Sequence, residues 1–89
     1  MEYITENIID RVRRMETYMD TVQAAVANGA ADAPEILELR RVLTEYMDGG
    51  QWMKDYEADE RGELPADLKR GVLSEDALYD LLTTLENET

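Results

Sequence analysis

The sequence predicts an all-α protein: a small antiparallel helical bundle of about four helices, with a long first helix as its spine. Apolar residues recur every three or four positions along several stretches of the 89-residue chain, which is the spacing of one face of an α-helix. Glycines and prolines lie between these stretches, where helices begin or end. β-branched residues never alternate over a run, so no strand is predicted. Residues 1–89 are therefore predicted to form one helical domain.

The first helix is predicted over residues 6–28. Its apolar face is a stripe of residues three or four positions apart, namely Ile4, Ile8, Val12, Met15, Met19, Val22 and Val26. Thr5 is the predicted N-cap, and Asn28-Gly29 suits the left-handed end of a helix. Coiled coils use the same spacing. We expect the stripe to pack within the chain, with an intermolecular seam as the alternative.

A second helix is predicted over residues 34–48 and a third over residues 51–60. Pro34 suits a first helical turn, and the short turn before it makes the first two helices antiparallel neighbours. Gly49-Gly50 separates the second helix from the third, because each glycine disfavours a helix by ~1 kcal/mol. Arg61-Gly62 ends the third helix.

The last part of the chain is predicted to hold a short helical turn and a final helix. The turn covers residues 66–70 and is closed by a glycine. Ser74 is the strongest N-cap in the sequence, and Glu75 and Asp76 follow it where the helix dipole favours carboxylates. The final helix is therefore expected over residues 75–86.

The first helix is too long for the second to cover. At ~1.5 Å per residue, the first helix spans roughly 35 Å and the second only roughly 22 Å. Folded back from the turn, the second helix covers the stripe from Met15 to Val26. We therefore expect the final helix to cover Ile4, Ile8 and Val12.

Composition excludes several classes of protein. The chain has no Cys and no His, which rules out disulfides, a thiol nucleophile, a typical zinc site and a His-containing catalytic triad. No glycine-rich phosphate loop occurs. No stretch has the pattern of a signal peptide or the length of a membrane span, and the absence of Cys suits a reducing compartment. We expect no enzyme activity, no cofactor and no catalytic or metal-binding residue.

The charge is strongly negative and lies mainly in the second half of the chain. The formal net charge is −12, and residues 47–89 hold 12 acidic and 4 basic residues. A field of this sign repels nucleic acid and anionic lipid. We therefore expect no direct binding to nucleic acid or to membranes, and a protein partner, if charged, is expected to be basic.

The acidic run DYEADE at residues 55–60 invites comparison with calcium-binding loops. Neither a register beginning at Asp55 nor one beginning at Glu57 matches the residues that such a loop requires. An alternative is a looser site for a hard cation, with ligands from the acidic residues Asp55, Asp59, Glu60 and Glu63. A solvated acidic helix face is the simpler interpretation.

Trp52, Met53 and Tyr56 form an apolar group beside the acidic run. Trp and Tyr carry a polar atom on an apolar ring and often lie at the rim of a core or at interfaces. In one interpretation Trp52 plugs the end of the bundle beneath the Gly49-Gly50 break. In the other, a partner-binding surface is formed by residues in or next to the acidic run, namely Trp52, Asp55, Tyr56, Asp59, Glu60 and Glu63.

The run DLKRGVLSEDALYDLL at residues 67–82, with Trp52 and the acidic DYEADE upstream, resembles a family of small bacterial proteins known as a domain of unknown function. The resemblance covers most of the chain, and this run is its most specific part. It implies a small, all-helical, cytoplasmic bacterial protein. It implies no activity, cofactor or catalytic residue.

The leading prediction for function is a non-catalytic protein-interaction or regulatory module that uses the acidic surface near Trp52. The first alternative is a nucleic-acid mimic that inhibits a DNA-binding protein through its carboxylates, although lysines and arginines interrupt the acidic half. A carboxylate- or metal-dependent enzyme is the third and least favoured reading. The sequence also leaves a symmetric homodimer open, because apolar surface on the first helix or at Trp52 could pair with a second copy.

Overall fold

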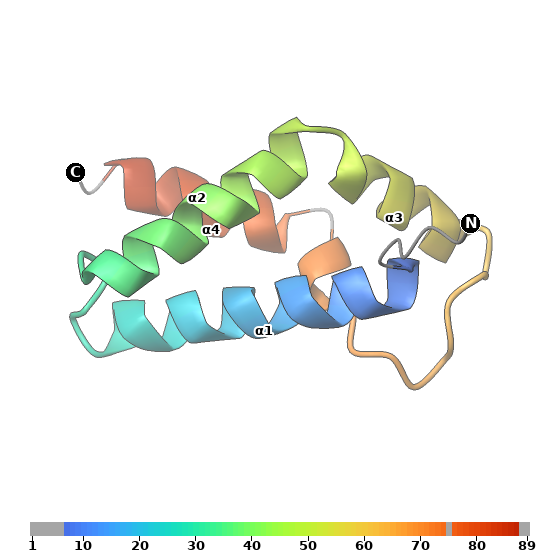
Figure 1. Ribbon diagram of the computed structural model, residues 1–89, viewed down its shortest axis with the longest axis horizontal. Coiled ribbons are helices and arrows are strands. Elements are labelled where there is room, and N and C mark those ends of the chain that lie inside the picture. The colour runs from blue at the N-terminus through green and yellow to red at the C-terminus, as the bar shows by residue number, and fades with distance from the viewer. Residues whose placement is uncertain (1–6, 75, 88–89) are drawn as a thin grey trace, which may run out of the picture.

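A computed structural model describes residues 7–74 and 76–87 of the chain. It contains four α-helices, which are α1 (Ile8–Ala27), α2 (Pro34–Asp48), α3 (Gln51–Glu60) and α4 (Ala77–Asn87). A short 3-10 helix, η1 (Gly71–Leu73), precedes α4. No strand occurs within the described ranges. The predicted all-α bundle with a long first helix is confirmed (Figure 1).

The spine helix α1 begins two residues later than predicted. Asn7 is its N-cap, and the side-chain oxygen of Asn7 accepts a hydrogen bond from the backbone N–H of Asp10 at 2.8 Å. Asn is among the strongest N-caps. Thr5, the predicted cap, and Ile4 lie outside the described residues. The other end of α1 agrees with the prediction, because Gly29 adopts a left-handed φ of 75° just beyond it.

The bounds of α2 and α3 agree with those predicted. The two glycines between them have different roles. A Cβ on Gly49 would lie 2.8 Å from the carbonyl oxygen of Glu45, so a side chain does not fit there. Gly50 adopts a φ of 92°, a backbone conformation that other residues rarely adopt. The link can therefore turn the chain sharply between the two helices.

The chain between α3 and α4 differs from the prediction. Ala66 and Asp67 form a turn, in which the Leu68 N–H donates to the Pro65 carbonyl oxygen at 3.2 Å, and the short helix η1 lies after residues 66–70 rather than within them. Ser74 ends η1, and α4 begins at Ala77, so Ser74 is not the N-cap predicted for the last helix. The Ser74 N–H donates a hydrogen bond to the Gly71 carbonyl oxygen at 3.1 Å, so Ser74 closes η1. The predicted role of Glu75 lies outside the described residues.

The packing order corrects one further prediction. The final helix was expected to cover the first half of α1, but α3 and η1 cover it instead. Asp55 of α3 binds Arg11 of α1, and Val72 of η1 binds Glu16 of α1. The two-glycine link directs α3 back over the start of α1, while α4 lies beside α2 (Figure 1). The stripe on α1 is therefore covered, although by other elements than predicted.

The core combines residues from every element. The stripe on α1 supplies one side, and Ile8 is half-buried at its beginning. The fully buried hydrophobic residues with the largest side chains come from three helices and from η1, namely Val12, Val22, Leu43, Tyr46, Val72, Leu78 and Leu85. Two charged side chains, Glu16 and Asp55, are also buried, and both are hydrogen-bonded.

Candidate functional site

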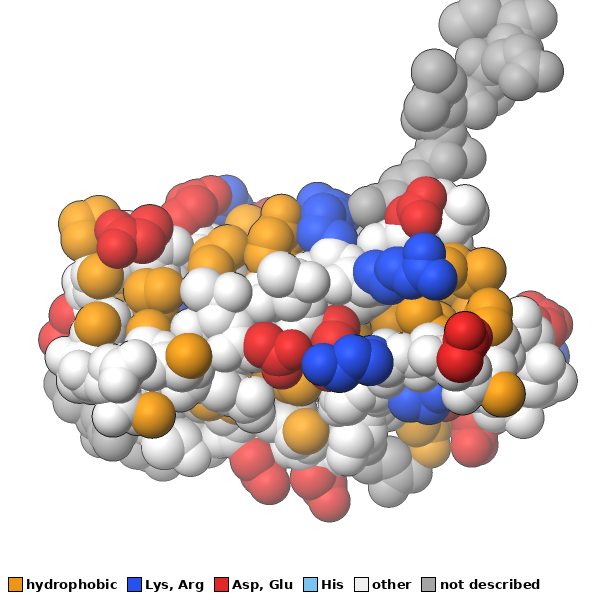
Figure 2. Space-filling view, turned by 90° about the horizontal axis from the view of Figure 1, so that it is seen from below, with side chains coloured by type: hydrophobic (Ala, Val, Ile, Leu, Met, Phe, Trp, Pro, Cys, Tyr) orange, Lys and Arg blue, Asp and Glu red, His pale blue; other side chains and the backbone are white. Residues whose placement is uncertain are grey.

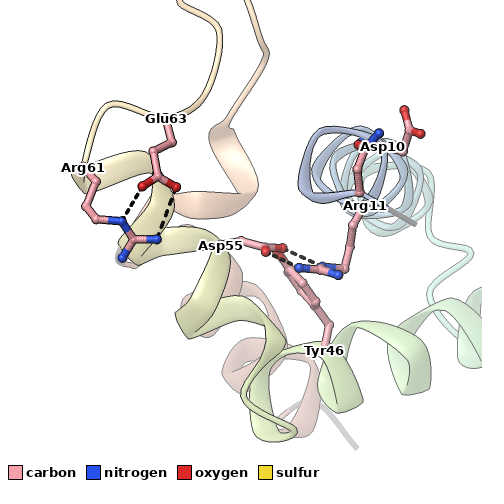
Figure 3. Close-up of polar contacts among 7 residues, drawn as sticks. Asp10, Arg11, Tyr46, Asp55, Arg61 and Glu63 are labelled. Atoms are coloured by element: carbon pink, nitrogen blue, oxygen red, sulfur yellow. Dashed lines mark hydrogen bonds and ion pairs between the residues drawn. The ribbon is translucent and has the colours of Figure 1, made fainter. Parts of the chain in front are cut away.

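A polar cluster joins α1, α2 and α3 beneath the surface. Asp55 is fully buried, and its carboxylate accepts hydrogen bonds from Arg11 Nε at 2.9 Å and from the Tyr46 hydroxyl at 2.7 Å. A second nitrogen of Arg11 binds the other oxygen of Asp55, so the pair is bidentate (Figure 3). Bidentate pairs of this kind are strong and fix orientation. The cluster therefore sets the position of α3 relative to α1 and α2.

The environment of this cluster changes the titration of Tyr46. Burial raises the pKa of the Tyr46 hydroxyl above its ordinary value, and the hydrogen bond to Asp55 raises this pKa further. Arg11 acts in the opposite direction. Burial disfavours the charged phenolate and a neighbouring carboxylate repels it, so Tyr46 stays protonated and serves as a hydrogen-bond donor.

Trp52 connects α3 to η1. Its indole N–H donates a hydrogen bond to the carbonyl oxygen of Val72 at 2.8 Å, and the ring is buried. On the other side of η1, a carboxylate oxygen of Glu16 accepts a hydrogen bond from the Val72 N–H, also at 2.8 Å. Both backbone polar groups of one residue are therefore satisfied by side chains from two different helices.

The structure separates the six residues predicted to bind a partner. Trp52 and Asp55 are buried, as in the alternative in which Trp52 plugs the bundle, and the binding of a partner by this set stays a prediction. Tyr56 is half-buried, and its ring stacks on Trp52 with centroids 5.0 Å apart. Glu60 and Glu63 are exposed, and Asp59 is partly buried.

Three of the acidic residues in this set are bound by arginines. Asp55 pairs with Arg11, as described above, and Asp59 pairs with Arg70. Glu63 pairs with Arg61, whose Nε lies 2.7 Å from a carboxylate oxygen (Figure 3). This hydrogen bond lowers the pKa of the Glu63 carboxyl.

The four carboxylates of the looser cation site do not converge. Across residues 7–74 and 76–87, no group of three or more acidic side chains is arranged to hold a metal ion. The alternation of inward and outward positions on α3 explains this. Asp55 points inward, whereas Glu60 is exposed to solvent.

An accessible hollow lies on the outer side of α3. It has a volume of about 420 Å³. We call the residues that line it the α3 surface, namely Met53, Tyr56, Glu57, Glu60 and Arg61. Met53 is 50 % exposed, which is high for a large hydrophobic side chain. The predicted partner-binding set omitted Met53, Glu57 and Arg61. Helical spacing would have added Met53 and Glu57 to the set, because residues 53, 57 and 60 share one helix face.

None of the helices in the described residues combines the length and the hydrophobicity that a membrane span requires.

Three comparisons with known proteins bear on identity. Neither the curated proteins nor the solved structures include a match to this chain. A protein-family model, described as a domain of unknown function (DUF4298), matches residues 1–88. This span is nearly the whole chain, and the protein therefore belongs to the DUF4298 family.

Proposed function

We propose that this protein is a non-catalytic interaction module of the bacterial cytoplasm, which binds a basic protein partner through the α3 surface. The observation that carries the proposal is Met53, a large apolar side chain that is half exposed in a hollow edged by carboxylates. Apolar anchors surrounded by polar residues are typical of protein interfaces.

The floor of the α3 surface is rigidly supported. Tyr56 stacks nearly parallel on Trp52, with an interplanar angle of 13°. Trp52 is held in turn by its hydrogen bond to Val72. A partner that contacts Tyr56 therefore meets a ring whose position is already fixed, which reduces the entropy lost on binding.

The charge on the α3 surface favours a basic partner. In the described part of the chain, neither Glu57 nor Glu60 takes part in an ion pair. Arg61, the one base that lines the hollow, is bound to Glu63. The net charge of −12 adds a long-range attraction for a basic molecule.

The same charges weaken the nucleic-acid-mimic alternative. Arg11, Arg61 and Arg70 each bind a carboxylate of the acidic region. Figure 2 shows the face that contains α1, on which basic and acidic side chains are interleaved. A mimic needs a continuous array of uncompensated carboxylates to imitate a phosphate backbone.

The test is capture of a partner from a bacterial lysate by the immobilised wild-type chain and by matched variants. We expect one protein that is released by added salt, lost with Met53→Ala and lost with Glu57→Lys. Asp67→Lys makes a charge change of the same type on an exposed residue outside the α3 surface, so it should retain the partner. A captured set that Met53→Ala and Glu57→Lys leave unchanged would contradict the proposal. Light scattering tests the homodimer that the sequence left open.

A further inference from the structure

A second hollow runs between α2 and α4, on a different part of the molecule. It has a volume of about 110 Å³, several times the ~30 Å³ of one water in the liquid. We call it the α2–α4 groove, and its lining residues are Thr44, Met47, Asp48, Tyr79, Leu82, Thr83 and Glu86. The two helices that form it lie beside each other in Figure 1.

The lining of the groove includes three large hydrophobic residues, Met47, Tyr79 and Leu82. Tyr79 is 58 % exposed, the highest exposure among the large hydrophobic residues of the described chain. Met47 and Leu82 are half-buried beside it. The residues that α4 contributes lie three or four positions apart from Tyr79 to Glu86, a span of roughly 10 Å or two helical turns. The groove is therefore long enough for two turns of a partner helix.

The charge of this groove differs from that of three other hollows on the described residues. Arg13 and Lys69 line one of these, Arg14 lines another, and Arg61 lines the hollow of the α3 surface. The α2–α4 groove has neither Lys nor Arg, and its two charged lining residues, Asp48 and Glu86, are both acidic. The whole of α4 contains no base.

The nearest bases along α2 are engaged elsewhere. Arg40 donates a hydrogen bond to the Ala31 carbonyl oxygen at 3.3 Å. Arg41 binds the carboxylates of Glu38 and Glu45. These arginines are therefore held by their own neighbours, and the field in the groove is set by carboxylates.

We propose that the α2–α4 groove binds a short amphipathic helix that carries lysines or arginines and one leucine-sized anchor. The anchor occupies the hollow between Met47 and Leu82, and the basic side chains reach the exposed carboxylate of Asp48. Helix-in-groove recognition joins an apolar stripe to an apolar floor in this way. A second copy of this chain fits poorly, because each copy has a net charge of −12.

The experiment titrates the wild-type chain into a labelled synthetic peptide of leucine and lysine, patterned as an amphipathic helix of about two to three turns. Tyr79→Ala and Asp48→Lys should each weaken binding at least about tenfold. Both changes spare the fold, because Tyr79 is exposed and a base at the C-terminal end of α2 suits the helix dipole. Glu57→Lys on the α3 surface and Asp67→Lys should change the affinity less than about twofold.

Two further probes separate specific docking from plain charge attraction. A leucine–glutamate peptide of the same pattern should not bind, and a glycine–lysine peptide without the apolar stripe should bind far more weakly. Equal weakening by Asp48→Lys and Asp67→Lys would overturn the proposal, as would an absence of binding. If only Glu57→Lys weakened binding, the proposal for the α2–α4 groove would be wrong and the proposal for the α3 surface would be supported. The two proposals can therefore fail independently.

Discussion

Asp55 is a carboxylate with no exposed surface, held by Arg11 and by the hydroxyl of Tyr46. A buried ion pair adds little net stability, because removing both charges from water offsets their attraction. Breaking such a pair is different, since it leaves one charge without a partner. The cluster therefore contributes more to the correct placement of α3 than to overall stability.

The substitution Asp55→Ala tests this view. It should lower the free energy of unfolding by about 3 kcal/mol, near the lower end of the range for a broken buried pair, because the Arg11 side chain retains 14 % exposure to water. Urea denaturation followed by circular dichroism measures the change. Glu63→Ala removes a carboxylate from an exposed pair and should leave the denaturation midpoint unchanged. Equal effects would show that Asp55 is not held as described.

Tyr46 predicts a loss of stability at high pH. Its pKa is raised in the folded state, so the unfolded state releases the phenol proton first as the pH increases. The contribution of Tyr46 to the free energy of unfolding is complete below about pH 10. Above that pH the contribution is lost at up to ~1.4 kcal/mol per pH unit. Between about pH 9 and pH 11, urea denaturation of Tyr46→Phe should therefore show a shallower decline than the wild type.

Tyr79→Phe is the matched control for the alkaline experiment. Tyr79 is 58 % exposed, and its environment offers the phenol no comparable burial. The decline of this variant with pH should follow that of the wild type. If Tyr46→Phe and Tyr79→Phe behave alike, the hydroxyl of Tyr46 is not buried against Asp55.

At the residue scale, the buried and exposed positions of α3 were predicted only in part. Its acidic run suggested an exposed acidic face, and the charge of Asp55 led to its assignment to a surface. Helical spacing gives the better guide, because Trp52 and Asp55 are three positions apart and share one face. The arginine that makes burial of Asp55 tolerable lies 44 residues away, and local sequence contains no sign of that contact.

At the scale of elements, η1 is the joint between the two ends of the bundle. Glu16 of α1 and Trp52 of α3 bind the N–H and the carbonyl oxygen of Val72. A Cβ on Gly71 would lie 3.1 Å from a carboxylate oxygen of Glu16, so a larger residue would push that side chain aside. Glycine at this position allows the carboxylate to approach η1.

Glu16→Ala should loosen this joint. The substitution leaves the buried N–H of Val72 without an acceptor and should cost about 2 kcal/mol, within the range for hydrogen bonds to charged groups. Hydrogen exchange of the Val72 amide should become faster in the same variant. Glu16→Gln retains an acceptor oxygen and should recover most of the protection. Unchanged exchange in Glu16→Ala would mean that Glu16 does not hold η1.

The helices themselves were largely predictable, because their ends are marked by local residues. Pro34 and the glycines at 49 and 50 fixed the bounds of α2 and the start of α3. The start of α4 and the position of η1 were not predicted correctly. The position of η1 is held by contacts of Val72 with Glu16 and Trp52, which lie 56 and 20 residues away in sequence.

At the scale of the molecule, the fold class followed from apolar periodicity, whereas the packing order did not. The length comparison correctly indicated that α2 leaves part of α1 uncovered. It assigned the cover to the final helix because that helix is rich in leucine. The direction of the two-glycine link decided the outcome, and α3 took the place beside Arg11. Periodicity reports which face is buried but not against which neighbour.

The charges also have an arrangement at this scale that composition does not reveal. The net charge of −12 suggests a uniformly acidic body. The arginines instead bind carboxylates around α3 and the following loop, whereas α4 has no base at all. Negative charge therefore also lies outside the sequence run DYEADE, where Asp48 and Glu86 line the α2–α4 groove.

The order in which the buried contacts occur along the chain has a consequence for synthesis on the ribosome. Arg11, Tyr46 and Asp55 all lie closer to the N-terminus than Val72, so their helices leave the ribosome before η1 and α4 do. Leu78 and Leu85 complete the core only when the end of the chain has left the ribosome. Until then the growing polypeptide presents an uncovered apolar face, the kind of surface that chaperones of newly made chains bind.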